Sequence, residues 1–154
     1  MNKYMRMAIN EARKGIRAGH GGPFGAVIVK DGEVIARGHN RLIQNDSVLL
    51  HAEMDAIENA GRLNYEDYRQ CSLYTTLSPC PMCSGPIILY NIPRVVIGEN
   101  TTLMGAENLL KCNDVEVVVL NDLRCRDLFL KFVCNNSEIW DGELEKVGNT
   151  TEVK

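Results

Sequence analysis

The sequence predicts an α/β fold with a largely parallel sheet that opens with an antiparallel hairpin. Two apolar runs flank the pair Asp31-Gly32, which is a strong short-range hairpin signal. After this hairpin, strand-like apolar runs alternate with segments of helical periodicity, the pattern of an α/β sandwich. The length of 154 residues, with 45% hydrophobic and 24% charged residues, suits one globular domain. We therefore expect residues 1–154 to form a single domain, with a flexible tail from about residue 145 to residue 154.

The first half of the chain predicts two helices and the hairpin. Residues 3–18 place apolar side chains at helical spacing, and Gly19 follows as a stop signal. The strands of the hairpin lie within residues 24–40. A second helix is expected at residues 51–60, with Gly61 just past its end.

The second half predicts three more strands and two more helices. The strands are expected at residues 71–77, 94–98 and 115–120. The last of them is rich in β-branched residues and is therefore expected to be buried on both faces. The segment 80–91 predicts a helix with Pro81 in its first turn, while Pro86 predicts a kink or a delayed start. Residues 121–133 predict a helix whose inward face carries Leu123, Leu128, Phe132 and Val133.

Composition excludes several classes of protein. The start of the chain has no secretory h-region, and no apolar run reaches the roughly 18 residues that cross a bilayer. We expect a cytoplasmic protein with no membrane partner. The formal net charge is −3 and no Lys/Arg stripe is present, so no nucleic-acid partner is expected and a small molecule is the better candidate.

Of the six cysteines, Cys80 and Cys83 stand out because they lie two residues apart between a strand and a helix. Without a secretory signal, reduced thiols are expected. The other four are expected to be small core residues: Cys71, Cys112, Cys125 and Cys134. The spacing of the pair alone fits a redox dithiol, half of a structural zinc site or half of a catalytic one.

A third metal-binding side chain, His51, begins another predicted helix. A structural zinc site needs a second CxxC or HxxxH pair, and the sequence has none. Three protein ligands leave the fourth tetrahedral position for water, which is the arrangement of a catalytic zinc. His20 and His39 are expected in a loop or in the core, not as ligands.

Glu53 completes the pattern. At the entrance of a helix it can lie beside a metal held by His51, and zinc lowers the pKa of its bound water from about 15.7 to about 7. Hydroxide is then the expected nucleophile, and Glu53 is expected to carry protons from the water to the substrate.

The motifs "HAE" at 51–53 and "PCPMC" at 79–83 form the H-x-E and P-C-x-x-C signature of zinc deaminases. With "GHN" at 38–40 and "YNIPRVVIGEN" at 90–100, the chain resembles the cytidine deaminase superfamily, and within it the fungal-type cytosine deaminases. The resemblance implies a three-layer α/β/α homodimer with a five-stranded mixed sheet and one Zn²⁺ per subunit, bound by His51, Cys80 and Cys83. The implied reaction removes the exocyclic amine of a free nucleobase by hydrolysis. The most similar family members convert cytosine to uracil and ammonia.

The same resemblance implies the substrate contacts. Asn40 would hold the ring carbonyl and ring N–H, the Ala52 backbone would add a contact, and the Ser78 carbonyl would face the leaving amine. Trp140 would cap the pocket, although a sole tryptophan is as often a packing residue. Phe24 is expected in the core or in the pocket wall.

The sequence departs from the pattern of the fungal-type cytosine deaminases at three places, so the identity of the substrate base stays open. Leu103 stands where the fungal enzymes place an aromatic ring, and Glu143 stands where they carry an aspartate, with Asp141 as an alternative. The stretch "GGPFGAVIVKDG" also resembles bacterial guanine deaminases. The alternatives are therefore guanine, isocytosine or another amino-heterocycle, an RNA-adenosine deaminase, or a non-catalytic module with a dithiol switch or zinc knot.

Overall fold

A five-stranded mixed sheet forms the centre of the molecule in the computed structural model, which describes residues 2–146. Its order is β2-β1-β3-β4-β5. The strands are β1 (Gly25–Lys30), β2 (Glu33–His39), β3 (Cys71–Leu77), β4 (Arg94–Glu99) and β5 (Glu116–Val119). The helices are α1 (Lys3–Ala18), α2 (Ala52–Ala60), α3 (Tyr65–Tyr68), α4 (Pro81–Leu89), α5 (Glu107–Cys112), α6 (Leu123–Asn135) and α7 (Ser137–Lys146).

The opening hairpin forms at the predicted pair. Asp31 and Gly32 have φ values of 51° and 79°, the left-handed conformations that a two-residue type I′ turn requires. β1 then pairs antiparallel with both β2 and β3, while β3, β4 and β5 are parallel. The predicted mixed sheet opened by an antiparallel hairpin is confirmed.

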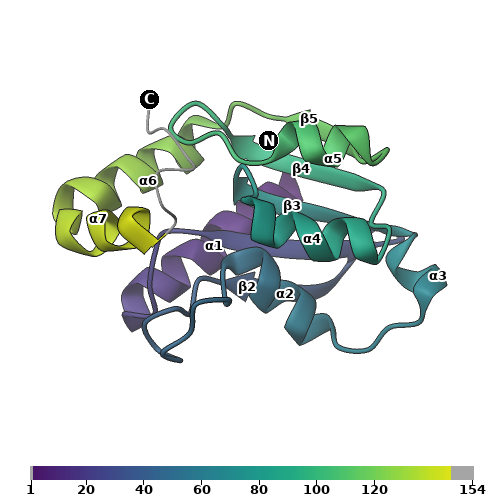
Figure 1. Ribbon diagram of the computed structural model, residues 1–154, viewed down its shortest axis with the longest axis horizontal. Coiled ribbons are helices and arrows are strands. Elements are labelled where there is room, and N and C mark those ends of the chain that lie inside the picture. The colour runs from purple at the N-terminus through teal and green to yellow at the C-terminus, as the bar shows by residue number, and fades with distance from the viewer. Residues whose placement is uncertain (1, 147–154) are drawn as a thin grey trace.

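Helices cover both faces of the sheet and make three layers (Figure 1). On one face, α2, α4 and α5 pack against the sheet through Ala52, Ala56, Ile87 and Leu110. On the other face, α1 and α6 pack through Met5, Ala8, Ile9 and Cys125. A smaller cluster joins Leu77 at the end of β3 to Phe129 of α6 and Trp140 of α7. This third cluster lies at the carboxyl end of β3, where the functional site begins.

The structure corrects the predicted burial of the last strand. β5 is an edge strand with its four residues exposed or half-buried, not buried on both faces. The parallel strand β4 covers one side of it, and within residues 2–146 no further strand pairs with the other side. A β-branched run does not distinguish a central strand from an edge strand.

Two helices also differ from the prediction. α4 begins at Pro81 and continues through Pro86, so the predicted delayed start is wrong. One proline removes one backbone hydrogen bond, which the remaining turns of this helix tolerate. In α6, Leu123 is 67% exposed because it is the first helical residue, while the buried positions are Cys125, Phe129 and Phe132.

Two of the four cysteines assigned to the core are not there. Cys71 and Cys125 are buried, but Cys112 and Cys134 are exposed at the ends of α5 and α6. The sequence analysis also missed three helices, α3, α5 and α7. None of the described helices is both long and apolar enough to cross a membrane. The predicted tail continues past Lys146, outside the described residues.

Candidate metal centre

Two helix starts bring the three predicted ligands together. His51 is the N-cap of α2 and Cys80 is the N-cap of α4, both with extended backbone (ψ of 166° and 170°). Neither side chain caps its own helix. Pro81 fits the first turn of α4 because its missing N–H needs no partner there. Cys83 lies one turn into α4, so its thiol returns to the same point as that of Cys80.

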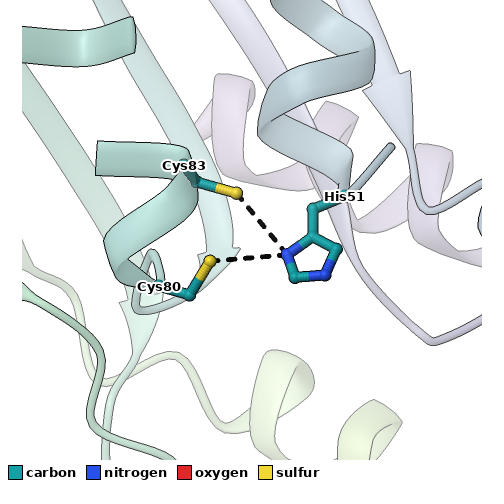
Figure 2. Close-up of side chains that lie close together, drawn as sticks. All are labelled: His51, Cys80 and Cys83. Atoms are coloured by element: carbon teal, nitrogen blue, oxygen red, sulfur yellow. Dashed lines mark hydrogen bonds between the residues drawn. The ribbon is translucent and has the colours of Figure 1, made fainter. Parts of the chain in front are cut away.

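The donor atoms are close enough to share one ion. The Nδ1 atom of His51 lies 3.5 Å from the Sγ atom of Cys80 and 3.5 Å from the Sγ atom of Cys83 (Figure 2). The three donor atoms all lie within 4.8 Å of one another. Among the described residues this is the one such group of His, Cys, Asp and Glu side chains.

These distances fit zinc. In a tetrahedral site with Zn–S bonds of about 2.3 Å and Zn–N bonds of about 2.0 Å, the nitrogen lies about 3.5 Å from each sulfur. Two sulfurs and one imidazole nitrogen are also the ligand types that zinc prefers. His51, Cys80 and Cys83 can therefore hold a Zn²⁺ ion, with one tetrahedral position left for water.

The pKa values of the Cys80 and Cys83 thiols depend on each other, because a hydrogen bond joins the two sulfurs. The hydrogen bond from Cys83 lowers the pKa of Cys80 to about 4, although burial acts in the opposite direction. The same bond, together with burial, raises the pKa of Cys83 well above its ordinary value. The protein alone thus favours one thiolate, and a cation between the sulfurs supplies the charge that stabilises a second one.

Glu53, in the first turn of α2, is 6% exposed and accepts a hydrogen bond from a side chain of β3. The Oγ1 atom of Thr75 in β3 donates a hydrogen bond of 2.7 Å to its Oε1 atom. Burial raises the pKa of Glu53, against the opposing effect of the Thr75 bond. A carboxyl group with a raised pKa exchanges protons more readily near neutral pH, as a general acid or base requires.

A cavity of about 400 Å³ opens at this site. Its wall includes two of the three metal-ligand candidates, His51 and Cys80, and also Glu53. The predicted substrate-contact residues in the wall are Phe24, Asn40, Ser78, Leu103 and Trp140. A base-sized ligand in this cavity would therefore lie beside the metal ligands.

Two other predicted contact residues, Ala52 and Asp141, are not among the residues of the cavity wall. Ala52 is fully buried and is not among the residues that line the cavity. Asp141 is exposed and does not line it either. Glu143 belongs to α7, but its side chain lies outside the part of the chain whose side chains the structure describes. The contacts of Ala52 and Glu143 with a substrate stay predictions.

Asn40 and Ser78 are fixed by neighbouring groups. The Oδ1 atom of Asn40 accepts the backbone N–H of Leu42 at 3.1 Å. The Ser78 hydroxyl donates to Glu107 at 2.8 Å and accepts the N–H of Gly105 at 2.9 Å. Since the Ser78 hydroxyl is thus satisfied within the protein, its carbonyl is the group that a ligand could use.

The structure adds residues that the sequence analysis missed. Most of them are apolar side chains of the loop after β2 and of helices α4, α6 and α7: Leu42, Ile43, Val48, Met82, Phe132 and Ile139. Thr75 was missed as well. The apolar residues in the stretch 41–50 were a usable signal, because a polar loop would be expected there.

Phe24 and Trp140 belong to one aromatic cluster. Their ring centroids lie 6.0 Å apart, and Phe129 lies 5.9 Å from Phe24 and 5.0 Å from Trp140. Such tilted and edge-on pairs stabilise one another beyond their buried area. The cluster fixes one apolar wall of the cavity.

A three-layer α/β fold that holds two thiols and one imidazole beside an open cavity defines a class, the single-zinc proteins whose metal keeps a free position. Comparison with known families identifies which family within this class the chain belongs to. The model of the "cytidine and deoxycytidylate deaminase zinc-binding region" matches residues 1–99. The chain belongs to this family of zinc-binding deaminases.

Individual relatives differ in their substrates. A cytosine deaminase of Candida albicans is 47% identical over 143 residues, which cover 92% of this chain and 95% of the relative. A guanine deaminase of Bacillus subtilis is 46% identical over 85 residues, or 54% of each chain. A solved structure from studies of tRNA:A34 deaminases has 30% identity and a TM-score of 0.69, covering 81% of this chain and 97% of that one.

Proposed function

We propose that this protein hydrolyses the exocyclic amine of a free nucleobase, with cytosine as the principal substrate and uracil and ammonia as products. One observation carries the choice of cytosine. The similarity to the cytosine deaminase spans nearly the whole of both chains, whereas the similarity to the guanine deaminase spans about half of each. The net charge of −3 also favours a small substrate over RNA.

The proposed reaction divides its tasks among the chain's own residues. His51, Cys80 and Cys83 hold the zinc ion. When bound, zinc lowers the pKa of a water molecule to about 7, so that a nucleophile is available at neutral pH. Glu53 accepts a proton from the attacking water and delivers it to the substrate, and the amine then leaves as ammonia. The bond from Thr75 keeps the Glu53 carboxylate at the metal centre.

The remaining wall residues orient the base. Asn40 presents its amide to the ring carbonyl and ring N–H, and the Ser78 carbonyl accepts a hydrogen bond from the departing amine. Phe24 and Trp140 provide an apolar wall. Leu103 covers the base from the loop after β4, without the stacking that an aromatic ring would add.

Two alternatives have specific support. Guanine is favoured by the similarity to the guanine deaminase and by a cavity of about 400 Å³, which has room for more than one ring. An RNA adenosine substrate is favoured by the likeness to the tRNA:A34 deaminase structure. In that case, binding should weaken steeply with added salt.

The proposal extends to the oligomeric state and the cellular location of the protein. We expect a homodimer in the cytoplasm, with one zinc ion per subunit. Leu89 and Tyr90 at the end of α4 and Leu109 of α5 are exposed apolar side chains that a second subunit could cover. Light scattering of the zinc-loaded protein at several concentrations measures this assembly.

Ammonia release by the purified, zinc-loaded protein tests the function. The substrates to compare are cytosine, 5-fluorocytosine, guanine, isocytosine, cytidine and creatinine. The proposal expects the largest kcat/KM for cytosine and its 5-fluoro analogue, and far less for the nucleoside. A larger kcat/KM for guanine, or release from none of these compounds, would contradict it.

A further inference from the structure

A second polar cluster lies outside the metal centre and joins three segments of the chain. Glu11 comes from α1, His20 from the loop after α1, and His39 is the last residue of β2. The Oε2 atom of Glu11 lies 3.2 Å from Nδ1 of His39, and Nε2 of His39 lies 2.9 Å from Nδ1 of His20. His39 is 1% exposed and Glu11 is 9% exposed, so their contact is shielded from water, whereas His20 at the other end is half-buried.

The contacts fix where the protons lie. A carboxylate can only accept, so Nδ1 of His39 carries a hydrogen. Burial lowers the pKa of His39, which keeps the ring neutral and leaves its Nε2 as an acceptor. Nδ1 of His20 must then be the donor of the 2.9 Å bond, and this bond persists when His20 is protonated.

The other charges around His39 form a pair of their own. Asp55 in α2 accepts the backbone N–H of His39 at 3.0 Å and the Nε–H of Arg41 at 3.0 Å. Arg41 thus carries the charge that offsets Asp55. The direction of hydrogen bonding between the two imidazoles is set by Glu11.

The residues that follow His20 and His39 in the sequence belong to the cavity wall. Asn40 follows His39, and Gly21 and Gly22 follow His20; all three line the cavity. The loop and the end of β2 are also joined by backbone bonds, from Asn40 N–H to the Phe24 carbonyl at 3.2 Å and from Ile43 N–H to the His20 carbonyl at 3.1 Å. The hydrogen bond between His20 and His39 joins the same two segments through their side chains.

Gly21 lies directly against the amide of Asn40. Its φ is +146°, and a Cβ atom at this position would lie 2.2 Å from the Oδ1 atom of Asn40. No side chain fits between the loop and the amide. Any shift of the loop therefore changes the space in which the Asn40 amide lies.

We propose that His20 is a positioning residue for Asn40: its Nδ1–H bond to His39 holds the glycine loop against the Asn40 amide and so sets how that amide meets the base. This rests on the proposed function, in which Asn40 contacts the substrate. The Oδ1 atom already accepts from Leu42, and the Nδ2 atom has no hydrogen-bond partner among the described residues. The held amide thus presents a donor that suits the ring carbonyl of a nucleobase.

The kinetic test compares two variants of His20 on the best base from the ammonia screen. His20→Ala removes the donor, while His20→Asn places an amide nitrogen near the former Nδ1 and serves as the rescue variant. We expect His20→Ala to raise KM by about three- to tenfold, the effect of one lost hydrogen bond, with kcat changed less than about twofold. His20→Asn should return KM most of the way to the wild-type value. An unchanged KM in His20→Ala, or an Asn variant as impaired as the Ala variant, would overturn the proposal.

A spectroscopic test needs no turnover. Long-range ¹H–¹⁵N spectra of the wild-type, zinc-loaded protein should show the Nδ1–H tautomer for His39 and a hydrogen on Nδ1 of His20. The side-chain amide signals of Asn40 should move in His20→Ala and stay near their wild-type positions in His20→Asn. An Nε2–H tautomer at His39, or an Asn40 amide indifferent to His20→Ala, would refute the positioning role. If no base is hydrolysed, the proposed function fails, and these spectra still decide whether His20 positions Asn40.

Discussion

In the proposed reaction, Glu53 separates proton transfer from metal binding, because its carboxyl group lies in the same cavity wall as His51 and Cys80 but outside the group of candidate ligands. Its replacement would remove the proposed proton carrier and leave His51, Cys80 and Cys83 in place. We expect Glu53→Ala to keep about one zinc per chain and the wild-type fold, and to lower kcat by at least about 100-fold. Zinc analysis, circular dichroism and ammonia release measure the three quantities. Near-wild-type turnover in Glu53→Ala would contradict the proposed role.

Thr75→Val provides a matched control for Glu53. The substitution keeps the shape of the side chain and removes the 2.7 Å bond to the carboxylate. Because that bond opposes the effect of burial, its loss should raise the pKa of Glu53 further and shift the acidic limb of the kcat/KM profile to higher pH. The fall in turnover should be smaller than that of Glu53→Ala.

Leu103 bears on the identity of the base. If cytosine is the substrate, Leu103→Phe should raise kcat/KM for cytosine by about two- to tenfold, because a stacked ring adds about 0.5–1.5 kcal/mol. Kinetics with cytosine and guanine side by side measure this. An unchanged or lower value for cytosine, together with a gain for guanine, would point to the larger base.

His39 gives a pH dependence of stability. Burial lowers its pKa in the folded state, so the unfolded chain takes up the proton first as the pH falls below about 6.5. The stability contributed by the neutral ring is complete above this pH and is lost as the pH falls toward the lower pKa of the folded state. The difference in unfolding free energy between the wild type and His39→Asn should therefore narrow from pH 8 to pH 5.5, as measured by urea denaturation with excess zinc. A constant or widening difference would contradict this linkage.

At this scale the sequence predicted which side chains come together better than it predicted the contacts that support them. His51, Cys80 and Cys83 stand out in the sequence because zinc restricts ligand type and spacing, and Glu53 stands out because it completes the HxE motif. Thr75 and the bond between His20 and His39 do not stand out, since each joins segments far apart in the sequence. Side-chain contacts of that kind depend on the packed fold.

At the scale of elements, the metal centre depends on how α2 lies against β2. Gly38 of β2 lies at this contact, where a Cβ atom would come within 2.3 Å of the backbone nitrogen of Ala56 in α2. Gly85 of α4, by contrast, has open space around the corresponding position. Gly38 lies against α2 and Gly85 lies within α4, so the two glycines make a matched pair for the two helices that carry the candidate ligands.

We expect opposite effects from alanine at these positions. Gly38→Ala pushes α2 away from the sheet and should lower both the melting temperature and the zinc affinity, with a loss of at least about 1–3 kcal/mol in stability. Gly85→Ala should raise stability by about 0.5–1 kcal/mol, because alanine favours a helix interior. Calorimetry and a competitive zinc titration measure these effects. Equal stability of the two variants would show that the close contact is not needed.

Elements bordered by strong local signals were predicted more accurately than the others. The strand at 71–77 and the helix at 3–18 have the predicted bounds, because turn signals and strict periodicity border them. α5 and α7 were missed because each is short or has little periodicity, and its burial depends on neighbouring helices. The burial of β5 was wrong because a strand's place in the sheet order is a property of the whole fold.

At the scale of the whole molecule, the candidate zinc site lies between the starts of α2 and α4, two helices on the same face of the sheet. The polypeptide approaches this point from two distant parts of the sequence, and the sheet brings them together. The fold class and the zinc site were predictable from the sequence because each motif, HAE and PCPMC, supplies zinc-binding side chains at a predicted helix start. The base is not fixed in the same way, because the chain is similar both to a cytosine deaminase and to a guanine deaminase.

The most direct measurement of this account is zinc K-edge X-ray absorption on the purified protein, with metal content determined on the same sample. The account predicts about one zinc per chain with two sulfurs at about 2.3 Å and two nitrogen or oxygen atoms at about 2.0 Å, one of them from His51 and one from solvent. His51→Ala should lose the metal or its nitrogen ligand. A spectrum with four sulfurs, or with none, would contradict the shared site of His51, Cys80 and Cys83.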